Sequence, residues 1–170
     1  YIGYDLSVGD MSLSFDTSKT TGGTNRSASV SFTGIDGLQV VAGMAETLTA
    51  QANAGVDQET VGIKYTMGSI TVAAQANEVD DASTSNDDED ATHIGVSFAL
   101  SDQVSVSYAQ LETDFGKSTK TADETVSGVG VSYTAGSMSI KAYAGKTEND
   151  AGSATAVDLE EKGVTLSFSF

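Results

Sequence analysis

The chain ends in the stretch GVTLSFSF, residues 163–170, whose side chains alternate strictly between apolar and small polar. The apolar members are Val164, Leu166, Phe168 and Phe170, and the polar members between them are Thr165, Ser167 and Ser169. Alternation with a period of two residues predicts a β-strand with one apolar and one polar face. Chain ends usually fray and tolerate change, so large apolar side chains there require a surface that covers them.

The same alternation runs along the whole chain. The alternating runs lie at residues 2–8, 11–15, 28–32, 38–44, 61–65, 70–76, 94–98, 104–108, 129–133, 138–144 and 164–170. They predict about eleven strands of roughly 7–10 residues, and therefore an all-β chain forming a single domain over residues 1–170. Only the stretch AETLTAQANAGVDQE, residues 45–59, could pass for a helix, and it lacks a clear apolar stripe.

The connections between these runs alternate in length. Tight turns rich in Gly, Asp and Ser lie at VGDM (8–11), GIDG (34–37), MGSI (67–70), LSDQ (100–103) and AGSM (135–138). Longer polar segments lie around residues 17–26, 46–58, 78–92, 112–124 and 146–161. If the strands run up and down, all short turns share one rim and all long loops share the other.

An aromatic residue closes five of the strands that run toward the short-turn rim. These residues are Phe32, Tyr65, Phe98, Tyr133 and Phe168, with spacings of 33, 33, 35 and 35 residues. The hairpin segment YTMGSITVAA (65–74) also reappears as YTAGSMSIKA (133–142). A fixed period indicates one repeated hairpin with its loop, and it predicts an aromatic girdle at the short-turn rim. Independent convergence on good hairpin chemistry is the alternative explanation.

Composition excludes several classes of function. The 170 residues contain 24 acidic and 8 basic side chains, giving a formal charge of -16, which argues against a nucleic-acid partner. There is no cysteine, so disulfide scaffolds and thiolate metal sites are excluded. No apolar run approaches the roughly 18 residues of a transmembrane helix.

The side chains on the two faces of the predicted strands indicate whether the sheet lies in water or in a membrane. The polar faces carry mostly Ser, Thr and Gly, with fewer charges than the solvent side of a soluble sheet. The apolar faces match a lipid-facing band of about 25 Å that ends at an aromatic girdle. Unpaired sheet edges are unacceptable in lipid, so such a meander must close into a barrel. A soluble β-meander or sandwich remains the alternative.

Taken together, these features resemble the general diffusion porins of Gram-negative outer membranes. The resemblance covers essentially the whole chain and rests on the alternating strands, the short turns opposite long acidic loops, and the Phe-terminated last strand. It implies an antiparallel up-and-down transmembrane β-barrel of sixteen strands and a homotrimer in the outer membrane, in contact with lipid and lipopolysaccharide. It also implies that Val164, Leu166, Phe168 and Phe170 form the signal read by the outer-membrane assembly machinery.

The odd strand count departs from this family, since bacterial single-chain barrels have an even number. We therefore expect this chain to hold roughly the last eleven strands of a larger barrel. The first residues, YIGYDLSVGD, are already patterned and lack an initiator Met or a basic leader. The inward-folded constriction loop of such porins would then precede Tyr1.

A porin makes no bonds, so its candidate functional residues are those that line its pore. By strand parity, the lumen-facing charges include Asp5, Asp16, Lys64 and Lys141, with Tyr143 beside Lys141. Charges on a pore wall bias which small hydrophilic solutes pass. Together with acidic loops that attract cations, they predict a passive channel with mild cation selectivity. Lysines without a selective role are the alternative.

The densest charge cluster is EVDDASTSNDDEDATH, residues 78–93. Its Asp80, Asp81, Asp87, Asp88, Glu89 and Asp90 could offer oxygen ligands to Ca²⁺, although the spacing is not that of an EF-hand. A solvated surface loop is the alternative. The porin resemblance would add a role for Ca²⁺ or Mg²⁺ in bridging this loop to lipopolysaccharide phosphates. No other cofactor is expected.

Two further functions stay open at this point. One is a secreted, acidic β-repeat adhesin or structural surface protein that binds Ca²⁺. The other is an outer-membrane barrel enzyme, for which the single histidine, His93, and the many serines would be needed. No G-x-S-x-G pattern accompanies them, and His93 is read as a solvated loop residue at a strand start, so we expect no enzyme.

Overall fold

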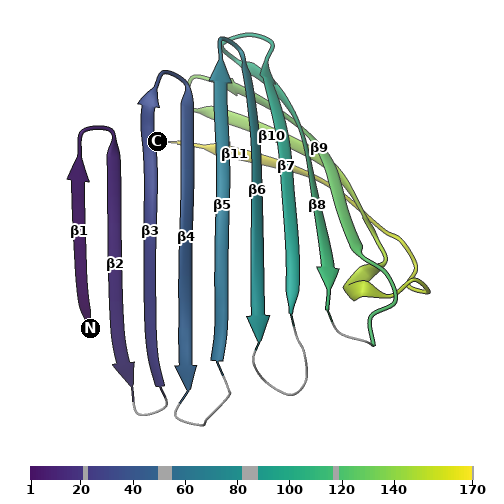
Figure 1. Ribbon diagram of the computed structural model, residues 1–170. Helices are drawn as coiled ribbons and strands as arrows, with labels where there is room; N and C mark the ends of the chain where they lie inside the picture. Colours follow the sequence, from purple (N-terminus) through teal and green to yellow (C-terminus); the bar gives the residue numbers. More distant parts are fainter. Residues whose placement is uncertain (21–22, 50–54, 82–87, 117–118, 170) are drawn as a thin grey trace.

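The computed structural model describes residues 1–20, 23–49, 55–81, 88–116 and 119–169. Within them it contains one antiparallel sheet whose eleven strands follow one another in chain order (Figure 1). The strands are β1 (Ile2–Val8), β2 (Met11–Thr20), β3 (Gly23–Ile35), β4 (Leu38–Thr49), β5 (Gly55–Met67), β6 (Ile70–Asp81), β7 (Glu89–Ala99), β8 (Val104–Phe115), β9 (Glu124–Ala135), β10 (Met138–Glu148) and β11 (Leu159–Phe168). A single 3₁₀ turn, η1 (Asp150–Gly152), lies between β10 and β11.

The predicted up-and-down order is confirmed. Each strand pairs with its neighbours in sequence, and β1 and β11 form the two edges of the described sheet. The pairing register is continuous along every ladder except for one bulge in β3, between Phe32 and Ile35. In Figure 1 the sheet curves strongly, so that β9–β11 pass behind β5–β7. This curvature is that of a barrel wall rather than of a flat sandwich layer.

Two-residue turns set the register at the short-turn rim. Gly9, Gly37, Gly68 and Gly136 each occupy a turn with a φ between 58° and 72°, the left-handed region that glycine adopts without strain. Gly37 has a second constraint, because a Cβ there would lie 2.1 Å from the Thr66 carbonyl oxygen. These turns fix which residues face each other on neighbouring strands, and hence which face each side chain occupies.

The strands extend further toward the opposite rim than the sequence predicted. β4 continues to Thr49 and β5 begins at Gly55, so the described parts of the stretch 45–59 are strand and not helix. Likewise β6 reaches Asp81 and β7 begins at Glu89. The long polar loops expected at 17–26, 46–58, 78–92, 112–124 and 146–161 therefore lie partly within strands. Ladder hydrogen bonds continue there because they depend on the backbone and not on apolar side chains.

The described residues contain no buried hydrophobic side chain. The accessible surface is 11312 Å², against about 7,900 Å² for a compact soluble monomer of 17.4 kDa. No second layer covers the sheet within the described ranges, so the alternative of a soluble sandwich is wrong. No helix in the described ranges is long and apolar enough to cross a membrane.

Candidate functional site

The sheet has two chemically distinct faces. Residues in cross-strand register share a face, and successive residues along a strand alternate between faces. The polar face presents mostly small hydroxyl and glycine residues, including the neighbouring pairs Ser7 and Ser12, Thr66 and Thr71, and Ser105 and Ser132. The apolar face presents the aliphatic and aromatic residues of the alternating runs.

All five residues predicted to line a pore lie on the polar face. Asp5 stands opposite Ser14, and Asp16 stands opposite Gly3 and Ser27. Lys64 lies between Gln39 and Ala73, Lys141 between Ser132 and Thr165, and Tyr143 between Gly130 and Gly163. The Tyr1 hydroxyl donates to the Asp16 carboxylate, and this hydrogen bond and the negative charge raise the pKa of Tyr1. The placement agrees with the parity argument, whereas a role in selectivity stays a prediction.

Tyr143 is the largest side chain among these five, and its position depends on a glycine. Its ring lies over Gly163 on β11, where a Cβ would be 2.4 Å from Tyr143 Cε1. The Tyr143 hydroxyl donates a 2.7 Å hydrogen bond to Glu161 Oε1. The absence of a side chain at position 163 therefore lets the ring lie flat along the wall and reach Glu161.

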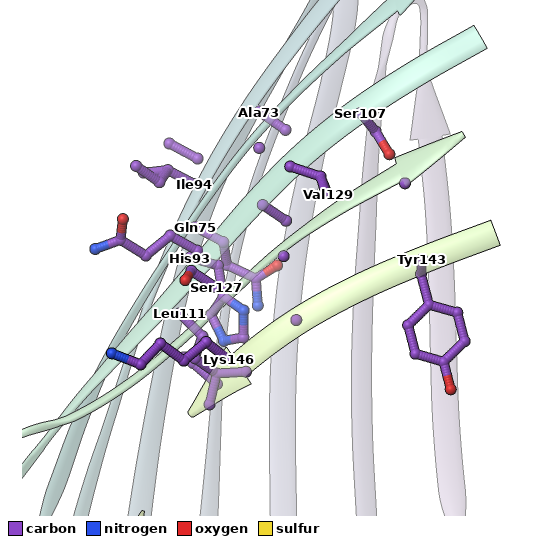
Figure 2. Close-up of a pocket in the computed structure, with 18 of the residues that line it drawn as sticks. Ala73, Gln75, His93, Ile94, Ser107, Leu111, Ser127, Val129, Tyr143 and Lys146 are labelled. Carbon is purple, nitrogen blue, oxygen red and sulfur yellow. The ribbon is translucent and has the colours of Figure 1, made fainter. Parts of the chain in front are cut away.

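The polar face encloses a hollow of about 1140 Å³ that extends from β4 to β11 (Figure 2). Among its lining residues are Lys64, Gln75, His93, Leu111, Tyr143 and Glu161. In Figure 2 the side chains of Gln75, His93 and Leu111 gather at one part of the hollow, and Tyr143 projects from β10 elsewhere. The hollow shows that the polar face is the concave face of the curved sheet.

The sequence pattern did not indicate several of these residues as part of the polar face. His93 is not a loop residue, because it lies within β7 in register with Gln75 on β6 and Leu111 on β8. The apolar run marks only the central part of each strand, whereas the strand continues into polar residues on the long-loop side. The same parity places three of them on the polar face: Gln75 within its run, His93 one residue before its run, and Glu161 three residues before its run.

The polar face is also less uniformly polar than the sequence predicted. Leu111, Val126 and Leu159 lie on it, joined by the register pairs of Leu111 with Val126, Val126 with Thr147, and Thr147 with Leu159. Leu159 is 52% exposed. Exposure of apolar side chains to water is unfavourable. These three residues therefore make this part of the polar face chemically different from the rest.

The five predicted girdle aromatics lie on the apolar face beside the short turns. Phe32 pairs with Met11, Tyr65 with Leu38, Phe98 with Ile70, Tyr133 with Val104 and Phe168 with Met138. The apolar residues between them and the opposite rim are open to the surroundings, with Val129 55% and Val164 74% exposed. Their contact with lipid headgroups stays a prediction.

The proposed assembly signal belongs to this same face. Val164, Leu166 and Phe168 all face outward from β11, and Leu166 and Phe168 are each 54% exposed. Phe170 lies outside the described residues. The structure thus places these three side chains on the outward face, and their recognition stays a prediction.

Toward the long-loop rim, the apolar face becomes charged. Arg26 lies 3.8 Å from Glu46, Lys146 lies 2.9 Å from Asp158, and Lys162 lies 3.2 Å from Glu160. On β10 the apolar residues extend from Met138 to Ala144, about 23 Å of strand at 3.3 Å per residue. The apolar band is therefore bounded by aromatics at one rim and by ion pairs at the other.

The acidic stretch does not converge on one point within the described residues. Asp80 and Asp81 are neighbours near the end of β6 and face opposite sides, as do Glu89 and Asp90 on β7. The Asp88 carboxylate accepts a 2.9 Å hydrogen bond from the Asp81 amide. No three His, Asp or Glu side chains in the described part of the chain are placed to hold a metal ion. Asp87 lies outside that part, and the Ca²⁺ site stays a prediction.

Two connections at the long-loop rim contact each other: the one between β8 and β9, and the one between β10 and β11 that contains η1. The Lys120 ammonium donates to the Ala151 carbonyl and lies 4.8 Å from the centre of the Phe115 ring. The Ala151 amide in turn donates a 2.6 Å hydrogen bond to Glu124. Since Phe115 and Glu124 belong to the polar face, η1 folds over the concave side of β8 and β9.

Comparison with solved structures places this architecture among porins. An anion-selective porin from Comamonas acidovorans superposes with a TM-score of 0.73 at 13% identity, covering 96% of this chain and 57% of that one. A porin refined at 1.8 Å gives 0.74 at 16% identity, covering 95% and 59%. The trimer form of in-vitro folded OmpT, an outer membrane protein of Vibrio cholerae, gives 0.69 at 16% identity, covering 98% and 63%. This chain thus spans about three-fifths of the length of these proteins.

Sequence comparison gives the family. Comparison with curated protein sequences yields no significant match. The profile of the family described as Gram-negative porin, however, matches residues 6–170, which is nearly the whole chain. The match agrees with the exposed apolar band, the concave polar face and the strand order, and it does not support a secreted adhesin. The chain belongs to the Gram-negative porin family of the bacterial outer membrane, as its sequence pattern predicted.

Proposed function

We propose that the protein forms a water-filled channel through which small hydrophilic solutes and ions diffuse passively, with a mild preference for cations. The observation that carries this proposal is the concave polar face, which has hydroxyl side chains along its length and a large open hollow. No step in it requires catalysis. The outward apolar band, bounded at both rims, supports a position across the membrane.

The sign of the selectivity follows from the charges on the polar face. Its carboxylates are Asp5, Asp16, Asp81, Glu89, Glu124 and Glu161, whereas its described lysines are Lys64 and Lys141. Excess negative charge on a channel wall raises the local concentration of cations. The Comamonas porin is described as anion-selective, but at 13% identity it shares the fold alone.

The partners proposed for this channel follow from its outer surface and its relatives. We propose a homotrimer, supported by the trimer form of the Vibrio cholerae protein. We also propose contact of the long-loop rim with lipopolysaccharide, bridged by Ca²⁺ or Mg²⁺ at the acidic stretch. The outward residues of β11 would be recognised by the outer-membrane assembly machinery.

Reversal potentials across planar bilayers with a KCl gradient test the channel and its selectivity. We expect a potential of the sign that indicates K⁺ preference. Glu161→Gln should reduce the K⁺ to Cl⁻ permeability ratio by up to about twofold, because it removes a wall charge. Glu160→Gln is the matched control, since Glu160 lies on the opposite face beside Lys162, and it should leave the ratio unchanged. A wild-type preference for Cl⁻ would contradict the proposed selectivity.

A further inference from the structure

One part of the hollow differs from the rest of the polar face. Here the wall combines an ammonium group, two hydrogen-bonding side chains and an apolar side chain, from Lys64, Gln75, His93 and Leu111 on four consecutive strands. We propose that this part of the wall is a binding site for solutes that join a carboxylate to an apolar ring, such as aromatic monocarboxylates. The inference rests on the channel proposed above, whose permeating solutes it would select.

The register of four strands defines the shape of the site. Lys64 on β5 is in register with Ala73 on β6, Gly95 on β7 and Ala109 on β8, which together form a low floor. The next row of the polar face toward the long-loop rim contains Gln75, His93 and Leu111, whose larger side chains form a raised edge. The distance from β5 to β8 is three strand spacings, or about 14 Å. The floor is therefore wide enough for a six-membered ring beside the lysine.

The charge of the site comes from Lys64. Unlike Arg26, Lys146 and Lys162, which pair with carboxylates, Lys64 has no ion pair or hydrogen-bonded side chain in the part of the chain that the structure describes. It also lines the hollow and is exposed. An unpaired ammonium group in a concave site can bind a carboxylate without first breaking an internal ion pair.

The other side chains favour a solute with an apolar body over a simple anion. Leu111 continues into the apolar strip with Val126, and the floor of Ala73, Gly95 and Ala109 offers only backbone and methyl groups. A ring lying on this floor would cover apolar surface that otherwise faces water. Gln75 and His93, both exposed in the hollow, can hydrogen-bond to ring substituents or to the carboxylate. An organic ammonium ion would instead place its charge against Lys64.

Direct binding to the full-length porin, folded in detergent micelles, tests the site independently of conduction. Sodium benzoate is the probe, and isothermal titration calorimetry is the measurement. We expect saturable binding by the wild-type protein, weakened about fivefold or more in Lys64→Met. Lys141→Met is the matched control, because Lys141 is also an exposed lysine on the polar face, three residues from a short turn, but does not line the hollow. It should change the affinity by less than about twofold.

Two further probes separate the contribution of the solute's carboxylate from that of its apolar ring. Acetate should bind at least about tenfold more weakly than benzoate, since it lacks the ring, and benzylammonium should not compete with benzoate. Leu111→Ser should weaken benzoate binding while leaving acetate unchanged. Heat-modified migration on gels establishes that each variant is folded, and Lys64→Gln provides a second test of the charge.

The site is overturned if benzoate does not bind saturably, if Lys64→Met and Lys64→Gln bind it as the wild type does, or if acetate binds equally well. KCl conductance, measured on the same preparations, separates the two proposals. Normal conductance without benzoate binding would remove the site and leave the channel. Benzoate binding that depends on Lys64, without conductance, would support the site and remove the channel.

Discussion

At the scale of single residues, glycines shape the concave wall as much as charged groups do. Tyr143 lies flat because position 163 has no side chain, and this orientation brings its hydroxyl to Glu161. The ring also lines the hollow. The position of the most prominent side chain on the wall is thus set by a neighbour on another strand.

Gly163→Val should therefore displace the Tyr143 ring and break its hydrogen bond to Glu161. We expect a loss of about 1–3 kcal/mol in the free energy of unfolding, because the added atoms overlap the ring. Urea titration of the protein folded in lipid vesicles measures this change. Gly95→Val is the control, because a Cβ at Gly95 meets its nearest atom at an ordinary 3.8 Å. Equal losses in both variants would show that the effect comes from β-sheet glycines in general.

At the scale of the element, each strand has an apolar face and a polar face, and the two tolerate different side chains. In β11, Leu166 faces outward and is 54% exposed, whereas its neighbour Thr165 stands opposite Lys141 on the polar face. One residue of offset thus separates a position on the outward apolar face from one on the concave polar face. This two-residue period is the property that assigns every residue of the wall to a side.

The pair Leu166→Arg and Thr165→Arg tests this assignment within one strand. We expect Leu166→Arg to lower the free energy of unfolding from vesicles by about 2–4 kcal/mol, since the charge must enter the hydrocarbon layer. Thr165→Arg should change it by less than about 1 kcal/mol, because its side chain lies on the concave polar face. The measurement is denaturant unfolding in vesicles. A larger loss for Thr165→Arg than for Leu166→Arg would reverse the assignment of the two faces.

At the scale of the whole molecule, the part of the sheet that the structure describes has no apolar core. None of its described hydrophobic side chains is buried, and the apolar residues of the alternating runs lie on the convex face. Burial of apolar surface, the main driving force for folding, must then come from the surrounding lipid and not from a second layer of protein.

The protein should consequently require an amphiphile to fold. In aqueous buffer without detergent we expect aggregation, because the exposed apolar face far exceeds what soluble monomers tolerate. Addition of detergent micelles to the denatured chain should restore β-structure, followed by circular dichroism, and a monodisperse species on gel filtration. A monodisperse, fully β-structured species in buffer alone would contradict the membrane assignment.

Much of this architecture could be predicted from the sequence, because a period of two residues is a local property. The strand order, the side occupied by Asp5, Asp16, Lys64, Lys141 and Tyr143, and the outward direction of Val164, Leu166 and Phe168 all follow from it. The strand ends did not, since the backbone ladder continues past the apolar run into polar residues. His93 was misplaced for this reason.

What the sequence by itself determined is the face of each side chain, since alternation along a strand is encoded one residue at a time. What only the tertiary structure decided is which residues of different strands meet: Tyr143 with Gly163 and Glu161, Lys120 with Ala151, and Lys64 in one hollow with His93 and Leu111. The physical reason is that cross-strand register and sheet curvature depend on the turns and on pairing between distant segments. Alternation within a strand contains no information about either.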